Sequence, residues 1–202
     1  MKPEKLGAYY ESILDEEARK EGGVYYTPLY IVDYIVEHTL AKLLQGKTPK
    51  EAARIKIVDP ACSAGIFLLG AYQNLLDWHE KHSGKLTLTK RRKILTNNIF
   101  GVDIDPLAVE ITKYCLSMMC SEGKDFSIGL DGNVRCGNSL VDTGFYDLGF
   151  SEDVERTVKP FNWRKAFPDA FKQGGFDCVI GNPPYVKKEH LSEETTASLH
   201  AM

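Results

Sequence analysis

Hydrophobic and polar positions divide the chain into an opening helical part and a longer part in which strands and helices alternate. Residues 6–20 carry apolar side chains at helical spacing. A second helix is expected to begin at Thr27 and Pro28 and to end at Gly46, with Thr27 as the N-cap and Pro28 in the first turn. Its apolar stripe predicts a packing face formed by Ile31, Ile35, Leu40 and Leu43.

From residue 51 onward, short apolar runs that end in turn residues alternate with helical patterns. The expected strands are 55–60, 98–105, 133–140 and 176–184. The expected helices are 66–82, one that opens at Pro106, a short one around 163–171, and a short one that contains Arg91 and Arg92. This alternation predicts a parallel α/β sheet with right-handed crossovers. The predicted organisation is a helical segment over 1–50 and an α/β domain over 51–202.

Composition narrows the possible classes of protein. Hydrophobic residues make up 43% of the 202 residues and the formal net charge is −3, so any nucleic-acid-binding surface must be local. The run KRRK at 90–93 is most simply a solvated helix face. Five cysteines without a CxxC pair disfavour zinc ribbons and disulfide frameworks, and they favour a reducing cytoplasm. No metal site, signal peptide or membrane-spanning apolar run is predicted.

The stretch VDPACSAGIFLL places small residues where the first strand turns into a helix. Backbone amides around Ser63 and Gly65 can approach a ligand closely, or the small residues simply make a tight turn. Asp59 disfavours a phosphate at this turn and favours a ligand with an ammonium group. The GxGxxG pattern is absent, which disfavours an NAD-dependent dehydrogenase, and so is the GKS or GKT ending of a phosphate-binding loop.

The next two strands also end in polar residues, at the sheet edge where ligands of open parallel sheets bind. Asp103 in FGVDIDP can accept both hydroxyl groups of a ribose, and Asp105 is expected to cap the helix that follows. Asn138 in CGNSL either binds an adenine amino group or forms an Asn-Ser turn, and the sequence weighs these two interpretations equally.

The stretch CVIGNPPYVK ends the fourth strand with two prolines that keep the chain extended. The side-chain carbonyl of Asn182 and the backbone carbonyl of Pro183 can together accept both hydrogens of one amino group. Tyr185 offers a ring face for stacking. Combined with the acidic strand ends, these residues predict a site for S-adenosylmethionine beside a planar amine.

Five stretches in order resemble motifs X, I, II, III and IV of the γ-order N6-adenine DNA methyltransferases, especially the methylase parts of type IIG restriction-modification systems. They are GGVYYTPLYIVDYIV, VDPACSAGIFL, FGVDIDP, CGNSL and GNPPY. The resemblance implies a Rossmann-like class I fold dependent on S-adenosylmethionine. One departure is Ser63, which stands where motif I usually has glycine; a positive φ there would strain the loop.

The resemblance also implies roles for individual residues. Thr27 would hold the methionine end of the cofactor, Asp103 its ribose and Asn138 its adenine. The residues implied to bind the cofactor are Thr27, Asp59, Pro60, Ala61, Cys62, Ser63, Gly65, Asp103, Ile104, Asn138 and Ser139. The residues implied to clamp a flipped-out adenine are Asn182, Pro183, Pro184 and Tyr185.

The expected function is therefore site-specific methylation of adenine N6 in double-stranded DNA. The resemblance implies about seven strands in a complete enzyme, so the four counted here predict a fragment, with target-recognition and possible nuclease domains elsewhere. One alternative is a non-catalytic module of a split enzyme that binds S-adenosylmethionine or DNA. The other is a protein-glutamine or ribosomal-RNA methyltransferase sharing NPPY, against which the DPAC and GVYYTP stretches argue.

Overall fold

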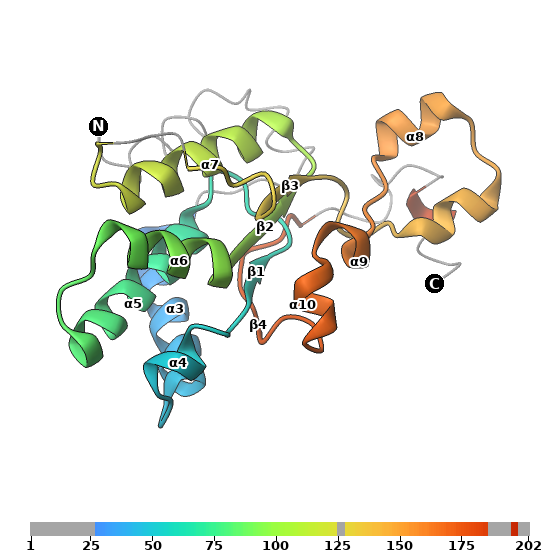
Figure 1. Cartoon of the computed structure of the whole chain (residues 1–202). Helices are drawn as coiled ribbons and strands as arrows, with labels where there is room; N and C mark the ends of the chain where they lie inside the picture. The colour runs from blue at the N-terminus through green and yellow to red at the C-terminus, as the bar shows by residue number, and fades with distance from the viewer. Residues whose placement is uncertain (1–26, 125–127, 186–194, 198–202) are drawn as a thin grey trace.

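A parallel sheet with helices on both faces organises the chain (Figure 1). The computed structural model describes residues 27–124, 128–185 and 195–197, so the helix expected at 6–20 lies outside the described residues. Within those residues the sheet has four strands in the order β3-β2-β1-β4, all parallel to their neighbours. Their bounds are β1 Ile57–Asp59, β2 Ile99–Asp103, β3 Val134–Cys136 and β4 Cys178–Val179. The predicted parallel α/β sheet is confirmed.

Alternating side chains of the strands supply two separate cores. Ile57 and Ile99 face the larger core, whereas Val58 and Phe100 face a smaller aromatic one, as the period of two along a strand requires. The larger core is covered by α3 Leu29–Leu44, α5 Ile66–Ser83, α6 Leu88–Asn98 and α7 Pro106–Cys120. The aromatic core is covered by α9 Trp163–Ala166 and α10 Pro168–Lys172, on the opposite side of the sheet in Figure 1.

The start of α3 differs from the sequence prediction. Pro28, with φ −56° and ψ 139°, is the N-cap residue, and no side chain caps the helix. Thr27 therefore lies one residue too early to act as the predicted N-cap. Its hydroxyl group instead contacts a residue far away in the sequence, as described below.

The packing face of α3 is also rotated from the predicted one. Ile31, Ile35 and Leu43 are only partly buried, and Leu40 alone of the predicted set is fully buried. The buried residues repeat every four positions: Val32, Val36, Leu40 and Leu44. A Cβ atom on Gly70 of α5 would lie 3.2 Å from Val32 and 3.3 Å from Val36, so a glycine lets the two helices approach closely on this face.

The helices that follow the strands have the predicted caps and extents. Asp105 caps α7, because its carboxylate accepts a hydrogen bond of 2.8 Å from the Leu107 amide and Pro106 occupies the first turn. A short helix that the sequence did not predict, α4 Pro49–Ala52, begins with a capping box between Thr48 and Glu51.

The predicted helix around Arg91 and Arg92 is confirmed as part of α6. The Arg91 guanidinium group donates hydrogen bonds to the carbonyl groups of Cys120 at 3.0 Å and Met119 at 2.9 Å. Arg91 therefore caps the C-terminus of α7. Arg91 thus stabilises the fold by joining α6 to the end of α7.

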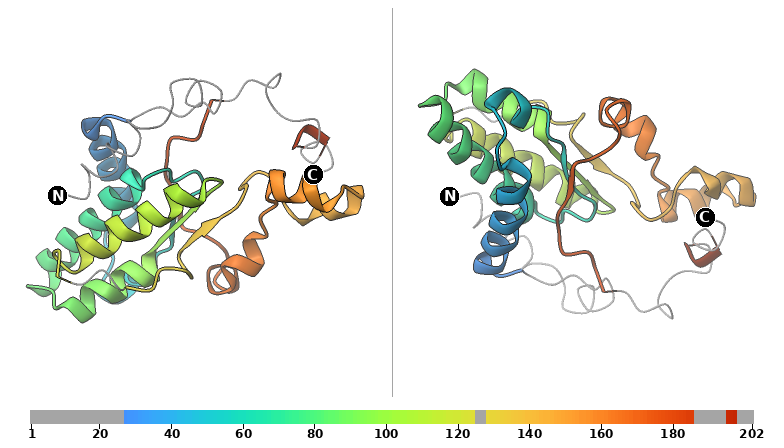
Figure 2. Two further views of the ribbon diagram at one scale, coloured as in Figure 1. Left: turned by 90° about the horizontal axis from the view of Figure 1, so that it is seen from above. Right: turned by 90° about the horizontal axis from the view of Figure 1, so that it is seen from below.

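The connection between β3 and β4 is more ordered than predicted. It contains η1 Thr143–Leu148 and α8 Glu152–Val158. Phe145 of η1 and Val158 of α8 form a small separate core together with Val141. Both views in Figure 2 show this segment standing away from the sheet. The single helix expected at 163–171 is divided into α9 and α10, with Pro168 opening α10. Among the described residues, no helix is both long and apolar enough to cross a membrane.

Replacing Asn98 by alanine should lower the free energy of unfolding by about 2–4 kcal/mol, because two buried carbonyl groups lose their donor. Asn98 is fully buried, and its side-chain NH2 group donates to the carbonyl groups of Ala52 at 2.9 Å and Ile55 at 2.7 Å. Urea denaturation measures the change. The matched control is Asn97→Ala, since the Asn97 side chain is exposed and the variant should unfold like the wild type. Equal losses in the two variants would contradict the prediction.

Candidate active site at the carboxyl ends of the strands

The carboxyl ends of β1 and β2 place two acidic side chains beside the loop at residues 60–65. One Asp59 oxygen accepts a hydrogen bond of 3.0 Å from the Ala61 amide. The Asp103 carboxylate accepts hydrogen bonds from the Ser63 amide at 2.7 Å and the Asp105 amide at 2.9 Å. The backbone thus fixes the orientation of both carboxylates.

The loop itself is held in a strained conformation by several hydrogen bonds. Ser63 has φ 45°, in the left-handed region that serine rarely adopts, so the strain expected from its replacement of glycine is present. Its carbonyl accepts a hydrogen bond of 2.7 Å from the Thr112 hydroxyl. Gly65, with φ 83°, packs so closely that a Cβ atom would lie 2.7 Å from Thr112 Cγ2. This loop therefore packs tightly onto α7.

Burial opposes the ionisation of both acidic side chains. Asp59 is 1% exposed, and burial raises the pKa of its carboxyl group to about 7. Burial also raises the pKa of Asp103, although the hydrogen bonds from Asp105 and Ser63 oppose this shift. Among the described residues, neither carboxylate forms an ion pair with a basic side chain. A ligand with a cationic group and hydroxyl donors would complement this pair.

The end of β4 brings the predicted clamp next to Asp59. A Cβ atom on Gly181 would lie 2.8 Å from Asp59 Cγ, so glycine is required for this close approach. The side-chain NH2 group of Asn182 donates a hydrogen bond of 3.2 Å to the hydroxyl of Thr27. Pro183, Pro184 and Tyr185 follow on the surface, and the Tyr185 side chain is 74% exposed. Residues from three distant stretches therefore converge here: Thr27, Asp59 and Asn182.

Asn138, just after the end of β3, forms the turn that was one of its two predicted roles. The Asn138 side-chain carbonyl accepts a hydrogen bond of 3.1 Å from the Leu140 amide. The carbonyl group of the next residue, Ser139, accepts one of 3.1 Å from the indole of Trp163. Ile104, at the end of β2, is 46% exposed and accepts a hydrogen bond of 3.0 Å from the ammonium group of Lys159.

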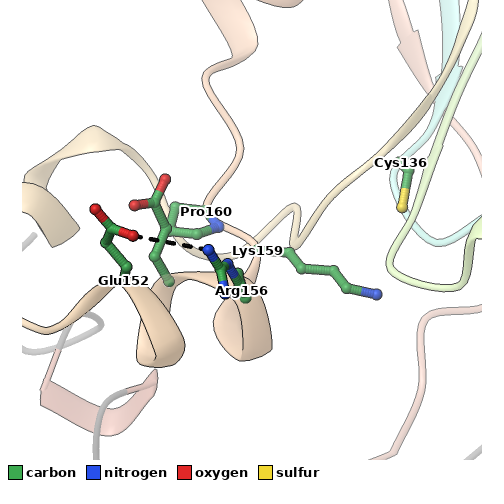
Figure 3. A pocket seen from close by; sticks show the side chains of 6 residues that line it. Cys136, Glu152, Arg156, Lys159 and Pro160 are labelled. Atoms are coloured by element: carbon green, nitrogen blue, oxygen red, sulfur yellow. Dashed lines mark ion pairs between the residues drawn. The ribbon is translucent and has the colours of Figure 1, made fainter.

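A shallow hollow of about 430 Å³ lies between the end of β3 and α8 (Figure 3). Its lining residues are Cys136, Glu152, Glu155, Arg156, Lys159 and Pro160. None of them belongs to the predicted site, although Lys159 also reaches Ile104. Figure 3 shows the ion pair between Glu152 and Arg156 on the α8 side, with Cys136 on the opposite side. The mixed charges of this hollow differ from the two carboxylates, Asp59 and Asp103, at the ends of β1 and β2.

Sequence reasoning missed three residues that shape the site. Gly181 is part of the GNPPY stretch, and a glycine directly after a strand is a sequence signal that the backbone packs closely against a neighbour. Thr112 and Lys159 had no such signal, because their contacts with the site are made across 49 and 55 residues of sequence.

The strand order β3-β2-β1-β4, with helices on both faces of the parallel sheet, defines the class as a Rossmann-like α/β fold. The chain is similar to the DrdV–DNA complex solved by cryoEM, with a TM-score of 0.57 and 22% identity, over 91% of this chain and 16% of that one. It is also similar to a nuclease-deletion mutant of the Type ISP restriction-modification enzyme LlaGI bound to a DNA substrate mimic. That likeness has a TM-score of 0.53 and 18% identity, and covers 80% and 13% of the two chains. At these identities the likeness shows the fold.

Sequence comparison gives the family. The family model described as Eco57I restriction-modification methylase matches residues 97–201. The chain belongs to this family, so the resemblance found in its motifs is confirmed. It is 30% identical to the type II restriction enzyme and methyltransferase RM.Eco57I of Escherichia coli, over 96% of this chain and 22% of the relative. It is 26% identical to the adenine-specific methyltransferase PglX of Streptomyces coelicolor, over 90% of this chain and 16% of the relative. The chain thus spans about a fifth of the length of these curated relatives.

The Asp59 carboxyl group should make the stability of the protein depend on pH. The folded state retains a proton that the unfolded chain has released, so the free energy of unfolding should fall as the pH rises from about 4 to about 7. Asp59→Asn should remove this pH-dependent loss of stability, which reaches roughly 4 kcal/mol at pH 8 in the wild type. Urea denaturation at several pH values measures it, with Asp77→Asn on the exposed side of α5 as the control. Parallel pH profiles for Asp59→Asn and wild type would contradict the prediction.

Proposed function

We propose that this chain carries the cofactor-binding and catalytic motifs of an adenine-N6 DNA methyltransferase of a restriction-modification system, with S-adenosylmethionine as the methyl donor. The observation that carries the proposal is the placement of Asn182 directly after Gly181, which packs against Asp59. This contact would set a clamp for an amine beside the acidic strand ends, where a cationic cofactor would bind. Membership of the Eco57I restriction-modification methylase family supports it.

The chemistry of the acidic strand ends fits S-adenosylmethionine. The cofactor has an ammonium group, a sulfonium group and a ribose with two hydroxyl donors, and it supplies the methyl group when bound. Asp59 would attract the positive charges, and binding would favour the ionised form of its carboxyl group. Asp103, oriented by the Ser63 and Asp105 amides, would accept the ribose hydroxyl groups.

The remaining cofactor contacts are proposed from the motifs and from position. Backbone groups of the tight loop after β1 would lie along the methionine and ribose, and residues at the ends of β2 and β3 would enclose the adenine. The loop residues are Pro60, Ala61, Cys62, Ser63 and Gly65, and the adenine-side residues are Ile104, Asn138 and Ser139. Since the side-chain carbonyl of Asn138 accepts from the Leu140 amide, its NH2 group is the part suited to an adenine ring nitrogen.

The clamp residues act by accepting hydrogen bonds. The lone pair of adenine N6 is delocalised into the ring, which makes the amino group a poor nucleophile. The carbonyl oxygens of Asn182 and Pro183 would hold its two hydrogens out of the ring plane, so that the lone pair becomes available to an electrophilic carbon. Pro184 would keep the chain extended, and the exposed Tyr185 ring would stack on the base. Positioning and electrostatics would then supply most of the rate.

Double-stranded DNA is the proposed partner. An adenine inside a duplex cannot reach the clamp, so it must be extruded at a cost of a few kcal/mol, which stacking on Tyr185 would partly offset. The names of the relatives include restriction enzymes, and two solved relatives are bound to DNA or a DNA mimic. We propose that target recognition, and any nuclease activity, depend on further domains of a longer protein that acts in the cytoplasm.

The cofactor proposal is tested by calorimetric titration with S-adenosylmethionine. Asp103→Ala should weaken binding by roughly 10- to 100-fold, because two hydrogen bonds to a charged acceptor are lost. Asp105→Ala is the matched control, since Asp105 follows two residues later and its carboxylate caps α7. It should bind the cofactor like the wild type. Saturable binding that both variants retain unchanged would contradict the ribose contact, and no binding by the folded wild type would contradict the cofactor.

The reaction is tested by analysing the methylated product. Incubation with adenine-containing DNA and labelled S-adenosylmethionine should yield N6-methyladenine, identified by mass spectrometry. Asn182→Ala should lower the transfer rate by about 10²- to 10³-fold, as expected for removal of one preorganised electrostatic contact, and should leave cofactor affinity unchanged. Parallel incubations with protein or ribosomal RNA in place of DNA that yield methylated glutamine or guanine, while DNA stays unmethylated, would support the protein or ribosomal-RNA alternative instead.

A further inference from the structure

Thr27 and Asn182 are 155 residues apart in sequence, yet their side chains form a direct hydrogen bond. The Nδ2 atom of Asn182 donates to the Oγ1 atom of Thr27 at 3.2 Å. Thr27 is 8% exposed and immediately precedes the Pro28 cap of α3. Because α3 has no side-chain cap, the Thr27 hydroxyl does not serve the helix terminus.

Both partners are presented from restricted backbones. Thr27 precedes Pro28 and Asn182 precedes Pro183, and a residue before proline is disfavoured in the helical region and confined to extended conformations. On its other side, Asn182 follows Gly181, where an added Cβ would lie 2.8 Å from Asp59 Cγ. The packing of Gly181 against Asp59 therefore restrains the Asn182 backbone next to β1, so the direction of the Asn182 side chain depends on its own torsions.

The orientation of the Asn182 amide decides whether the clamp can work. The NH2 and C=O ends of an asparagine amide have nearly the same size, so packing alone does not select one of them. An amino group of the substrate needs the carbonyl end as its acceptor. If the side-chain amide were turned by 180°, its NH2 group would face the amino group of the substrate. Two donors would then meet, and neither would have an acceptor.

We infer that Thr27 is a positioning residue: its hydrogen bond to Asn182 fixes the side-chain torsions of Asn182, with the nitrogen on the Thr27 hydroxyl and the carbonyl oxygen available to the substrate amine. The identity of that amine rests on the proposed function, whereas the hydrogen bond itself does not. This role differs from holding the methionine end of the cofactor, which the motif resemblance implies for Thr27. The two roles predict different effects of removing the hydroxyl group.

The test compares three variants of the full chain. Thr27→Val removes the hydroxyl group with little change in shape, and Thr27→Ser retains it. Thr39→Val, within α3, is the matched control, because the Thr39 hydroxyl donates to the Ile35 carbonyl at 2.7 Å rather than to Asn182. Circular dichroism and thermal unfolding confirm that each variant is folded before the measurements below.

The first measurement is the NMR signal of the Asn182 side-chain NH2 group in ¹⁵N-labelled protein, assigned by its loss in Asn182→Ala. In the wild type and in Thr27→Ser, one proton of this group should be protected from exchange with water. In Thr27→Val it should lose that protection and shift toward the position of a solvated amide, while Thr39→Val leaves it unchanged. Identical NH2 signals in wild type and Thr27→Val would overturn the inference, whether or not the protein transfers methyl groups.

The second measurement separates positioning from cofactor binding. Thr27→Val should lower kcat for methyl transfer by roughly two- to tenfold, the effect of one lost hydrogen bond, with the calorimetric affinity for S-adenosylmethionine unchanged and Thr27→Ser close to wild type. Weaker cofactor binding with unchanged Asn182 signals would assign Thr27 to the cofactor and overturn the inference. A wild type that transfers no methyl group would contradict the proposed function, and the NMR comparison would still decide the role of Thr27.

Discussion

The parallel pairing of β1 with a neighbour on each side is the constraint on which the candidate site depends. Ile57 is paired with Ile99 of β2 and with Cys178 of β4, so all three strands run in the same direction and end at the same edge. That edge receives Asp59, Asp103 and Asn182 from stretches far apart in the sequence. The register is secured by the two cores, because a slip of one residue would turn Ile57 toward the aromatic side and Val58 toward the aliphatic one.

The site at this edge is organised around negative charge. Backbone amides orient the Asp59 and Asp103 carboxylates, and burial opposes their ionisation. The loop between them contains Ser63 in a left-handed conformation, which is tolerated because contacts with Asp103 and Thr112 hold it in place. Among the described residues no basic side chain forms an ion pair with these acids, so a cationic ligand would complement them.

Packing and long-range contacts join parts of the chain that the sequence suggested were separate. Helix α3 shares the larger core with α5, so the helical segment before residue 50 is attached to the sheet by its apolar face. The division of the chain at residue 50 stays a prediction. The connection between β3 and β4 has a small core of its own, and Lys159 links it to Ile104 at the end of β2. Both attachments bear on the site, because α3 begins next to Thr27 and Ile104 follows Asp103.

The sequence by itself determined the alternation of strands and helices, the strand ends with polar residues, and the cap at Asp105, because each depends on residues close together in the chain. Tertiary structure decided the contacts that the local pattern does not contain. The residues next to Thr27 in the sequence predict that it caps a helix. In the structure Pro28 takes the cap position, and the Thr27 hydroxyl accepts a hydrogen bond from Asn182. Asn138 had two equal local interpretations; the hydrogen bond from the Leu140 amide shows the turn, and the contact with an adenine stays a proposal. The closeness of Gly181 to Asp59 likewise follows from strand order, which joins β4 directly to β1 and which no spacing in the sequence encodes.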